Sequence, residues 1–105
     1  MDKISIIQGD GYEAKLRFSG IPDVRAIKRV TFSCNFLNLC KEVEYDEEEG
    51  AFILRFTPRE TSSLTPCVTD FDITVEFDNE NVQTPIYRKS ITIQRKVNLC
   101  GNNRD

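Results

Sequence analysis

The sequence predicts an all-β domain, built as an antiparallel sandwich of two sheets with about seven strands and one short helical crossover. Three observations predict this fold class. Several short runs alternate apolar and polar residues, which is the period of a strand with one buried face. Turn-forming Gly, Asp and Asn residues separate these runs at short intervals. No stretch keeps the apolar spacing of a long helix.

The first two strands are predicted on either side of a Gly-Asp-Gly turn. Residues 3–8, KISIIQ, form a short first strand, and residues 9–11 form the turn. In residues 12–18, YEAKLRF, apolar side chains occupy the even positions and charged side chains the odd positions, so one face of this strand is solvated. Residues 19–27 connect it to the next strand, and we expect one helical turn there after Pro22.

The next predicted strand ends where the parity of the apolar residues changes. Four apolar residues share one face of this strand: Val30, Phe32, Cys34 and Phe36. From residue 37 to residue 45 the apolar residues lie at odd positions instead. A change of parity requires a turn or a bulge, which we place at residues 35–38.

A charged hairpin follows. Residues 46–50, DEEEG, join two alternating runs and predict the tip of a β-hairpin that ends in glycine. The return strand is AFILRF, residues 51–56, and its alternation predicts that Phe52, Leu54 and Phe56 are buried.

A helix-start signal comes directly after this hairpin. Residues 57–60, TPRE, match a capping box with proline at the first helical position. Pro66 and the weak helix formers before it limit the helix to about two turns. We interpret it as a crossover in which Leu64 plugs one end of the sandwich. The alternative is that Arg59 and the neighbouring Ser and Thr residues contact a ligand.

Two further strands complete the predicted domain. Residues 70–77, DFDITVEF, alternate almost without fault, and residues 78–81, DNEN, form a second hairpin tip. The final strand has Pro85 near its start, where a missing N–H is tolerated at a sheet edge. We therefore expect one β-sandwich domain over residues 1–97 and a flexible C-terminal tail over residues 98–105.

Composition excludes several classes of function. The chain has 105 residues and no histidine, which excludes Ser-His-Asp and Cys-His catalysis and most zinc-hydrolase sites. Without a cofactor motif either, we expect a non-enzymatic protein that holds no cofactor or metal. The net charge of −3 argues against direct binding of nucleic acid. No apolar run approaches ~18 residues, so no membrane span is expected.

The order of the motifs resembles a known family. The turn before YEAKLRF, the strand IKRVTFSC, the passage FILRFTPRETSSL leading into DFDITVEF, and the closing SITIQRKV follow one another over residues 5–97. In this order the chain resembles the small immunoglobulin-like β-sandwich modules of phage and prophage tail or baseplate proteins. The N-terminal domain of baseplate upper proteins is the most similar case. There a Thr-rich helical turn leads into a Tyr-Asp-x-x-Val-like strand, and residues 71–75, FDITV, stand in that place. The resemblance implies an immunoglobulin-like fold and a structural role.

An acidic cluster is the candidate partner-binding site. Six carboxylates fall close together: Glu42, Glu44, Asp46, Glu47, Glu48 and Glu49. The spacing of an EF-hand calcium loop is absent. A solvated hairpin tip is the simplest interpretation of the cluster. The alternative is a charged surface that binds a basic partner, because so many carboxylates create a local field well beyond that of the net charge.

The cysteines and the basic residues give weaker signals. None of the four cysteines has a C-x-x-C neighbour, and Cys34 shares its parity with a buried strand face. The redox state of the cysteines remains open, since an extracellular particle would permit disulfides. Basic residues at positions 88, 89, 95 and 96 are typical of an edge strand protected against aggregation.

Three hypotheses about function result. The favoured one is a phage-derived tail or baseplate module that acts by protein–protein contact, made in the host cytoplasm and carried in the virion, with a homo-oligomer left open. The alternative is a small phage-encoded inhibitor of host defence, similar to an anti-CRISPR protein, whose acidic surface binds a nuclease effector. The third is a carbohydrate-binding sandwich, for which Tyr12, Tyr45 and Tyr87 are the candidate aromatic residues.

Overall fold

The computed structural model describes residues 3–18 and 24–96 and shows an all-β fold, as predicted. The described part of the chain contains seven strands, a short 3-10 helix and a five-residue α-helix. In chain order the elements are β1 (Lys3–Ile7), β2 (Tyr12–Leu16), η1 (Val24–Ala26), β3 (Ile27–Cys34), β4 (Leu39–Asp46), β5 (Ala51–Phe56), α1 (Pro58–Ser62), β6 (Cys67–Phe77) and β7 (Val82–Gln94). The predicted tail, residues 98–105, lies outside the described residues.

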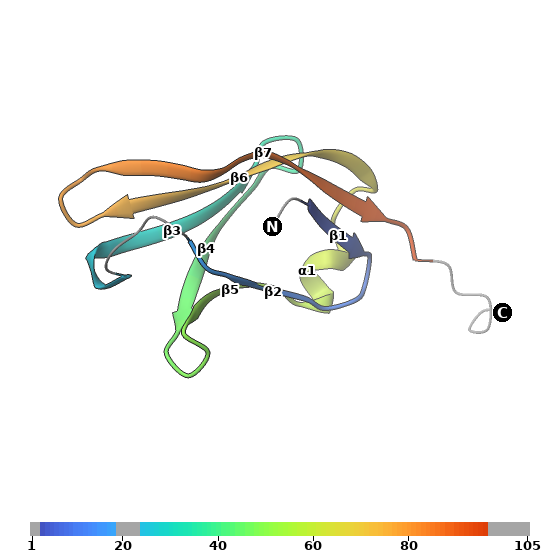
Figure 1. The fold of residues 1–105 in the computed structure, drawn as a ribbon. Helices are drawn as coiled ribbons and strands as arrows, with labels where there is room; N and C mark the ends of the chain where they lie inside the picture. Colours follow the sequence, from blue (N-terminus) through green and yellow to red (C-terminus); the bar gives the residue numbers. More distant parts are fainter. Residues whose placement is uncertain (1–2, 19–23, 97–105) are drawn as a thin grey trace, which may run out of the picture.

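Backbone pairing joins all seven strands into one sheet in the order β1-β7-β6-β3-β4-β5-β2. The sheet folds back on itself, so that β3, β6 and β7 lie over β2 and β5 (Figure 1). Strand β4 makes the turn, because it pairs with β3 as far as Val43 and with β5 from Glu44 onward. The predicted separation into two sheets is therefore not what the hydrogen bonding shows. The arrangement is closer to an incompletely closed barrel.

The first strand corrects the prediction of a purely antiparallel fold. Strand β1 pairs in parallel with the end of β7, from Lys3 opposite Ser90 to Ile7 opposite Gln94. All other strand pairs are antiparallel. Alternation in the sequence shows which face of a strand is buried, but it carries no information about the direction of a partner so distant in the chain.

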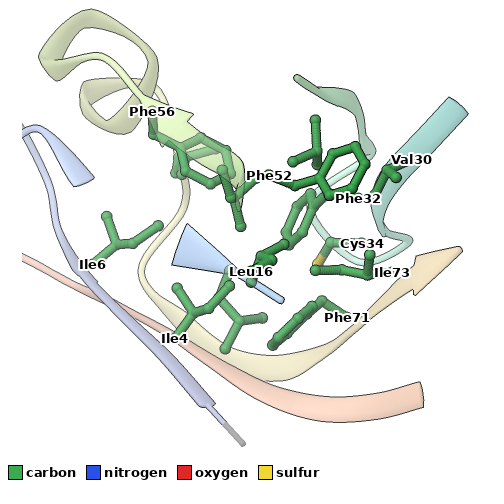
Figure 2. Packing of buried hydrophobic residues seen from close by; sticks show 14 of the residues in the cluster. Ile4, Ile6, Leu16, Val30, Phe32, Cys34, Phe52, Phe56, Phe71 and Ile73 are labelled. Carbon is green, nitrogen blue, oxygen red and sulfur yellow. The ribbon is translucent and has the colours of Figure 1, made fainter. Parts of the chain in front are cut away.

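The core fills the space between the two halves of the folded sheet. Phe32 is fully buried, and its ring stacks on Phe71 at 5.4 Å and meets Phe56 edge-on at 5.5 Å (Figure 2). The residues predicted to point inward from β5 are all buried, and those of β6 are buried up to Val75, with Phe77 packed partly buried against the core. Ile53 is also buried, although it lies on the outer parity of β5. Its cross-strand neighbours are Glu44 and Lys15, whose aliphatic stems flank it.

Phe36 corrects one predicted core position. Its side chain is 66% exposed, whereas we expected it to continue the buried face of β3. Strand β3 ends at Cys34, and residues 35–38 form a turn in which the Asn38 N–H donates to the Asn35 carbonyl at 3.0 Å. Asn38 has φ 55°, a conformation that asparagine tolerates better than most residues. This turn confirms the predicted change of parity.

Two bulges shape the free half of β7. Strand β1 reaches only residues 90–94, so within the described chain residues 82–89 have β6 on one side alone. The register shifts twice there, once across Thr84 and Pro85 and once across Tyr87 and Arg88. Pro85 thus lies at an edge and in a bulge, where its missing N–H does no harm. At the second bulge the Arg88 N–H donates to Asp72 at 2.6 Å, and Arg88 adopts φ 50°.

The helix α1 has the predicted capping box. Thr57 Oγ1 accepts from the Glu60 N–H at 3.2 Å, and Glu60 Oε1 accepts from the Thr57 N–H at 2.8 Å. Leu64 is buried beyond its end, as expected for a plug. The helix is further fixed by Thr61, which is fully buried and bonds to the β1–β2 turn at Gly9 and Asp10.

Candidate functional site

Most of the predicted acidic residues line one open groove on the outer face of the β4–β5 hairpin. We call this the acidic groove. It has a volume of about 720 Å³, and five of the six predicted carboxylates line it: Glu42, Glu44, Asp46, Glu47 and Glu48. The hairpin tip projects away from the rest of the molecule (Figure 1). The acidic residues therefore form one concave surface instead of being spread around the hairpin tip.

Strand geometry explains why these side chains gather. Val43 is buried, so its neighbours Glu42 and Glu44 point to the outer face of β4. At the tip, Asp46 Oδ1 accepts the N–H groups of Glu48 at 2.9 Å and of Glu49 at 3.1 Å. Asp46 thus holds the turn by a local side-chain bond to the backbone. Gly50, with φ 65°, completes the turn in a conformation that favours glycine.

Glu49 does not belong to the groove. Its carboxylate forms an ion pair with Lys15 of β2, and its carbonyl accepts from Arg17 at 3.1 Å. Neither of these two cations lines the groove. The structure therefore brings five of the six predicted residues together in the groove. Glu49 instead connects the hairpin tip to the β2 segment.

The cations in the groove wall already have acidic partners. Lys41 Nζ lies 2.5 Å from Glu60 Oε2 and 5.2 Å from the centre of the Phe56 ring. Arg55 Nε lies 2.9 Å from the Glu13 carboxylate. By contrast, four groove carboxylates form no ion pair within residues 3–18 and 24–96: Glu42, Glu44, Glu47 and Glu48. The groove consequently carries uncompensated negative charge.

Glu60 is the groove residue whose protonation is perturbed. The hydrogen bond from Lys41, followed by the Thr57 N–H, lowers the pKa of Glu60 below its ordinary value. The carboxylate of Glu60 is therefore ionised over the whole physiological pH range and holds Lys41 in the groove wall. The pair joins β4 to the capped start of α1.

Three further charged residues line the groove without having been predicted: Lys41, Arg55 and Glu60. The alternation in β5 signalled Arg55, because it lies two residues beyond Ile53, the partner of Glu44, and therefore on the same outer face of the hairpin. Nothing in the pattern signalled the contact of Lys41 with Glu60, since it joins β4 to a helix that lies beyond β5.

Other sequence-level candidates are dispersed. The three tyrosines lie on three different strands, Tyr12 on β2, Tyr45 on β4 and Tyr87 on β7, and no ring contact joins them in the described structure. Cys34 is buried, as its parity predicted. Cys40 is exposed on β4, and Cys67 begins β6. These three cysteines are free, and Cys100 lies outside the described residues.

The described residues contain no candidate metal site and no membrane-spanning helix, and the chain matches no known protein. Among the residues that the structure describes, no three acidic or cysteine side chains are placed to hold a metal ion. No helix in the same ranges has the length and apolar character needed to cross a membrane. No family model, curated protein or solved structure matches the chain.

Proposed function

We propose that this chain is a non-enzymatic binding domain that acts by protein–protein contact, with the acidic groove as its partner surface. One observation carries the proposal, namely that the groove concentrates carboxylates that the fold leaves unpaired. Several carboxylates outside the groove do have cationic partners: Glu13 pairs with Arg55, Asp70 with Arg88, and Glu76 with two cations of β3.

Unpaired carboxylates along one groove repel one another and contribute nothing to folding. A basic protein surface would offset that repulsion on binding and would be steered toward the groove at low salt. The concave shape adds an argument, because a groove can surround a protruding basic side chain, whereas a flat patch leaves it half solvated. Glu42, Glu44 and Glu47 are the residues that we assign to this contact.

The favoured version is a tail or baseplate structural module with an immunoglobulin-like arrangement. The order of strands, the capped crossover at α1 and the all-β fold support it. In this version several copies occupy a symmetric assembly, and the acidic groove meets a basic face of a neighbouring subunit. Mass spectrometry of purified phage particles is the direct test. Absence of the chain from such particles refutes the structural version while leaving a binding role intact.

The alternative, an inhibitor of host defence, is favoured by the groove itself. Nuclease effectors hold nucleic acid in positively charged channels. A domain with an acidic groove on a projecting hairpin is shaped to enter such a channel. A pull-down with purified effector complexes separates this version from the first.

One charge-reversal experiment tests the shared proposal. The double variant Glu44→Lys with Glu47→Lys should reduce capture of a protein partner at least about tenfold, which corresponds to about 1.4 kcal/mol. The matched control is Asp78→Lys with Glu80→Lys, which reverses two exposed carboxylates on the other hairpin tip. Equal capture by both double variants would show that the acidic groove is not the partner surface.

A further inference from the structure

A second hollow lies on the other side of β4, where this strand separates from β3. We call it the strand cleft. Pairing of the two strands ends at Val30 opposite Val43. If it continued, Arg29 would face Glu44, but β4 bends there to pair with β5. A cleft of about 590 Å³ opens between the diverging strands.

The floor of the strand cleft is apolar. Ile27, Val43 and Phe52 line it from three strands, together with Val24 of η1 and Tyr45 of β4. Val24 is 44% exposed and Tyr45 is 41% exposed, although both are large hydrophobic side chains. A smaller hollow of about 170 Å³ shares four of these residues and continues the apolar surface past Gly50. Exposed apolar side chains gathered in a concavity are typical of a binding site for another chain.

The cleft also exposes a free strand edge. Residues 44–46 of β4 pair with β5 on one side, and no described strand pairs with them on the other. The facing edge of β3 is less regular, because its register with β6 shifts between Ile27 and Arg29. The β4 edge is therefore the better template for an added strand. By contrast, two bulges and a proline protect the free half of β7.

Charge indicates what would occupy the cleft. On the β3 rim, Lys28 and Arg29 lie 3.8 and 3.9 Å from Glu76, so this one carboxylate offsets one of their two positive charges. On the β4 rim the cleft is lined by three of the unpaired carboxylates, Glu42, Glu44 and Glu47. An occupant must therefore supply positive charge on this rim and apolar side chains over the floor. Along an extended strand the two kinds would alternate, since Glu44 and Tyr45 point to opposite faces of β4.

We propose that the strand cleft binds an extended segment of a protein partner that adds to the free edge of β4 and alternates basic with apolar residues. The inference rests on the proposed function, because it makes this segment the part of the partner that is recognised. Main-chain hydrogen bonds to residues 44–46 align the bound segment along the edge of β4. An apolar side chain packs against Tyr45 and Val24, and its basic neighbours meet Glu44 and Glu47.

The test uses the whole chain and three synthetic probes of equal net charge. The first is the alternating peptide acetyl-Lys-Val-Lys-Phe-Lys-Val-Lys-amide. The second has the same composition with all lysines in one block, and the third replaces both valines of the first by proline. Binding is followed by amide chemical shifts in nuclear magnetic resonance spectra. We expect the alternating peptide to shift the amides of residues 27–29 and 44–46 and to bind at least about tenfold more tightly than the other two.

Two tyrosine variants locate the site. Tyr45→Ala should weaken binding of the alternating peptide about tenfold. Tyr87→Ala, which removes a more exposed ring from β7, should leave its binding unchanged. Thermal melts of both variants verify that they are folded. Equal binding of all three peptides, or no binding of any, overturns strand addition. Those outcomes leave the charge-reversal result untouched, so failure here and failure of the proposed function are distinguishable.

Discussion

Thr61 is the polar residue on which the docking of α1 depends. Its side chain is fully buried, and Oγ1 accepts the Gly9 N–H at 2.9 Å. The hydroxyl proton points to the Asp10 carbonyl at 2.9 Å or the Pro58 carbonyl at 3.1 Å. One atom therefore satisfies a donor and an acceptor of the β1–β2 turn. Gly9 adopts φ 85° in this turn, so the turn cannot easily move to find other partners.

Thr61→Val preserves the shape of this side chain and removes only its hydrogen bonds. The Gly9 N–H and the Asp10 carbonyl would each lose a buried partner, and each unsatisfied group costs about 1–3 kcal/mol. Because water has partial access to the turn, we expect the loss for the two groups together to lie at the lower end of their sum, about 2 kcal/mol. For a domain of about 100 residues this lowers the Tm by about 10 °C.

The assay is thermal and urea unfolding of three variants. Thr61→Ser keeps the hydroxyl and should recover most of the lost stability. Thr74→Val makes the same chemical change on the solvated face of β6, where the side chain has no hydrogen bond in the described structure, and should alter the Tm by no more than about 2 °C. If Thr61→Val were as stable as Thr74→Val, the bridging hydroxyl would have no role in docking the helix.

Further predictions concern a strained residue, a perturbed carboxylate and the thiols. Arg88→Val should lower the urea midpoint of unfolding more than Arg88→Asn does, because a β-branched residue resists φ 50° and asparagine tolerates it. Both variants lose the ion pair with Asp70, so they differ in the backbone preference alone. The lowered pKa of Glu60 means that its contribution is present above its ordinary pKa and is lost as pH falls through the folded value. Glu60→Gln should therefore flatten the acid limb of the stability–pH curve, measured by urea unfolding from neutral to acidic pH. In a Cys100→Ser background, Cys40 should react with a thiol reagent in the native state; Cys34, whose pKa is raised by burial, should react only on unfolding.

The alternation of apolar and polar residues predicted most of the strands, because each strand has one buried face and the apolar residues show which face it is. The alternation in residues 70–77 and the parity change at 35–38 both correspond to what the structure shows. The same pattern failed where pairing depends on distant parts of the chain. It could not reveal that β1 pairs in parallel with β7, or that β4 changes partner at Val43. It also could not mark Thr61 as buried, because its partners are backbone groups about 50 residues away along the chain.

The candidate site was predictable to the extent that it is local. Five acidic residues share the groove because they follow one another along a single hairpin. Glu49 does not line the groove, because the turn directs its side chain toward Lys15, a residue of another strand. The strand cleft was invisible in the sequence for a different reason. A cleft arises where two strands stop pairing, and the residues that form it look like those of any strand that continues.

The bend in β4 links the two halves of the proposed surface. Before Val43 the strand completes the half of the sheet that contains β3, and after it the strand belongs with β5. The same bend turns the acidic residues of β4 into a ridge between two hollows, since Glu42, Glu44 and Glu47 line both the acidic groove and the strand cleft. A strand paired with β3 along its whole length would close the cleft and would leave the carboxylates on a flat sheet. The reversal of the sheet at β4 and the proposed binding surface therefore have one structural origin.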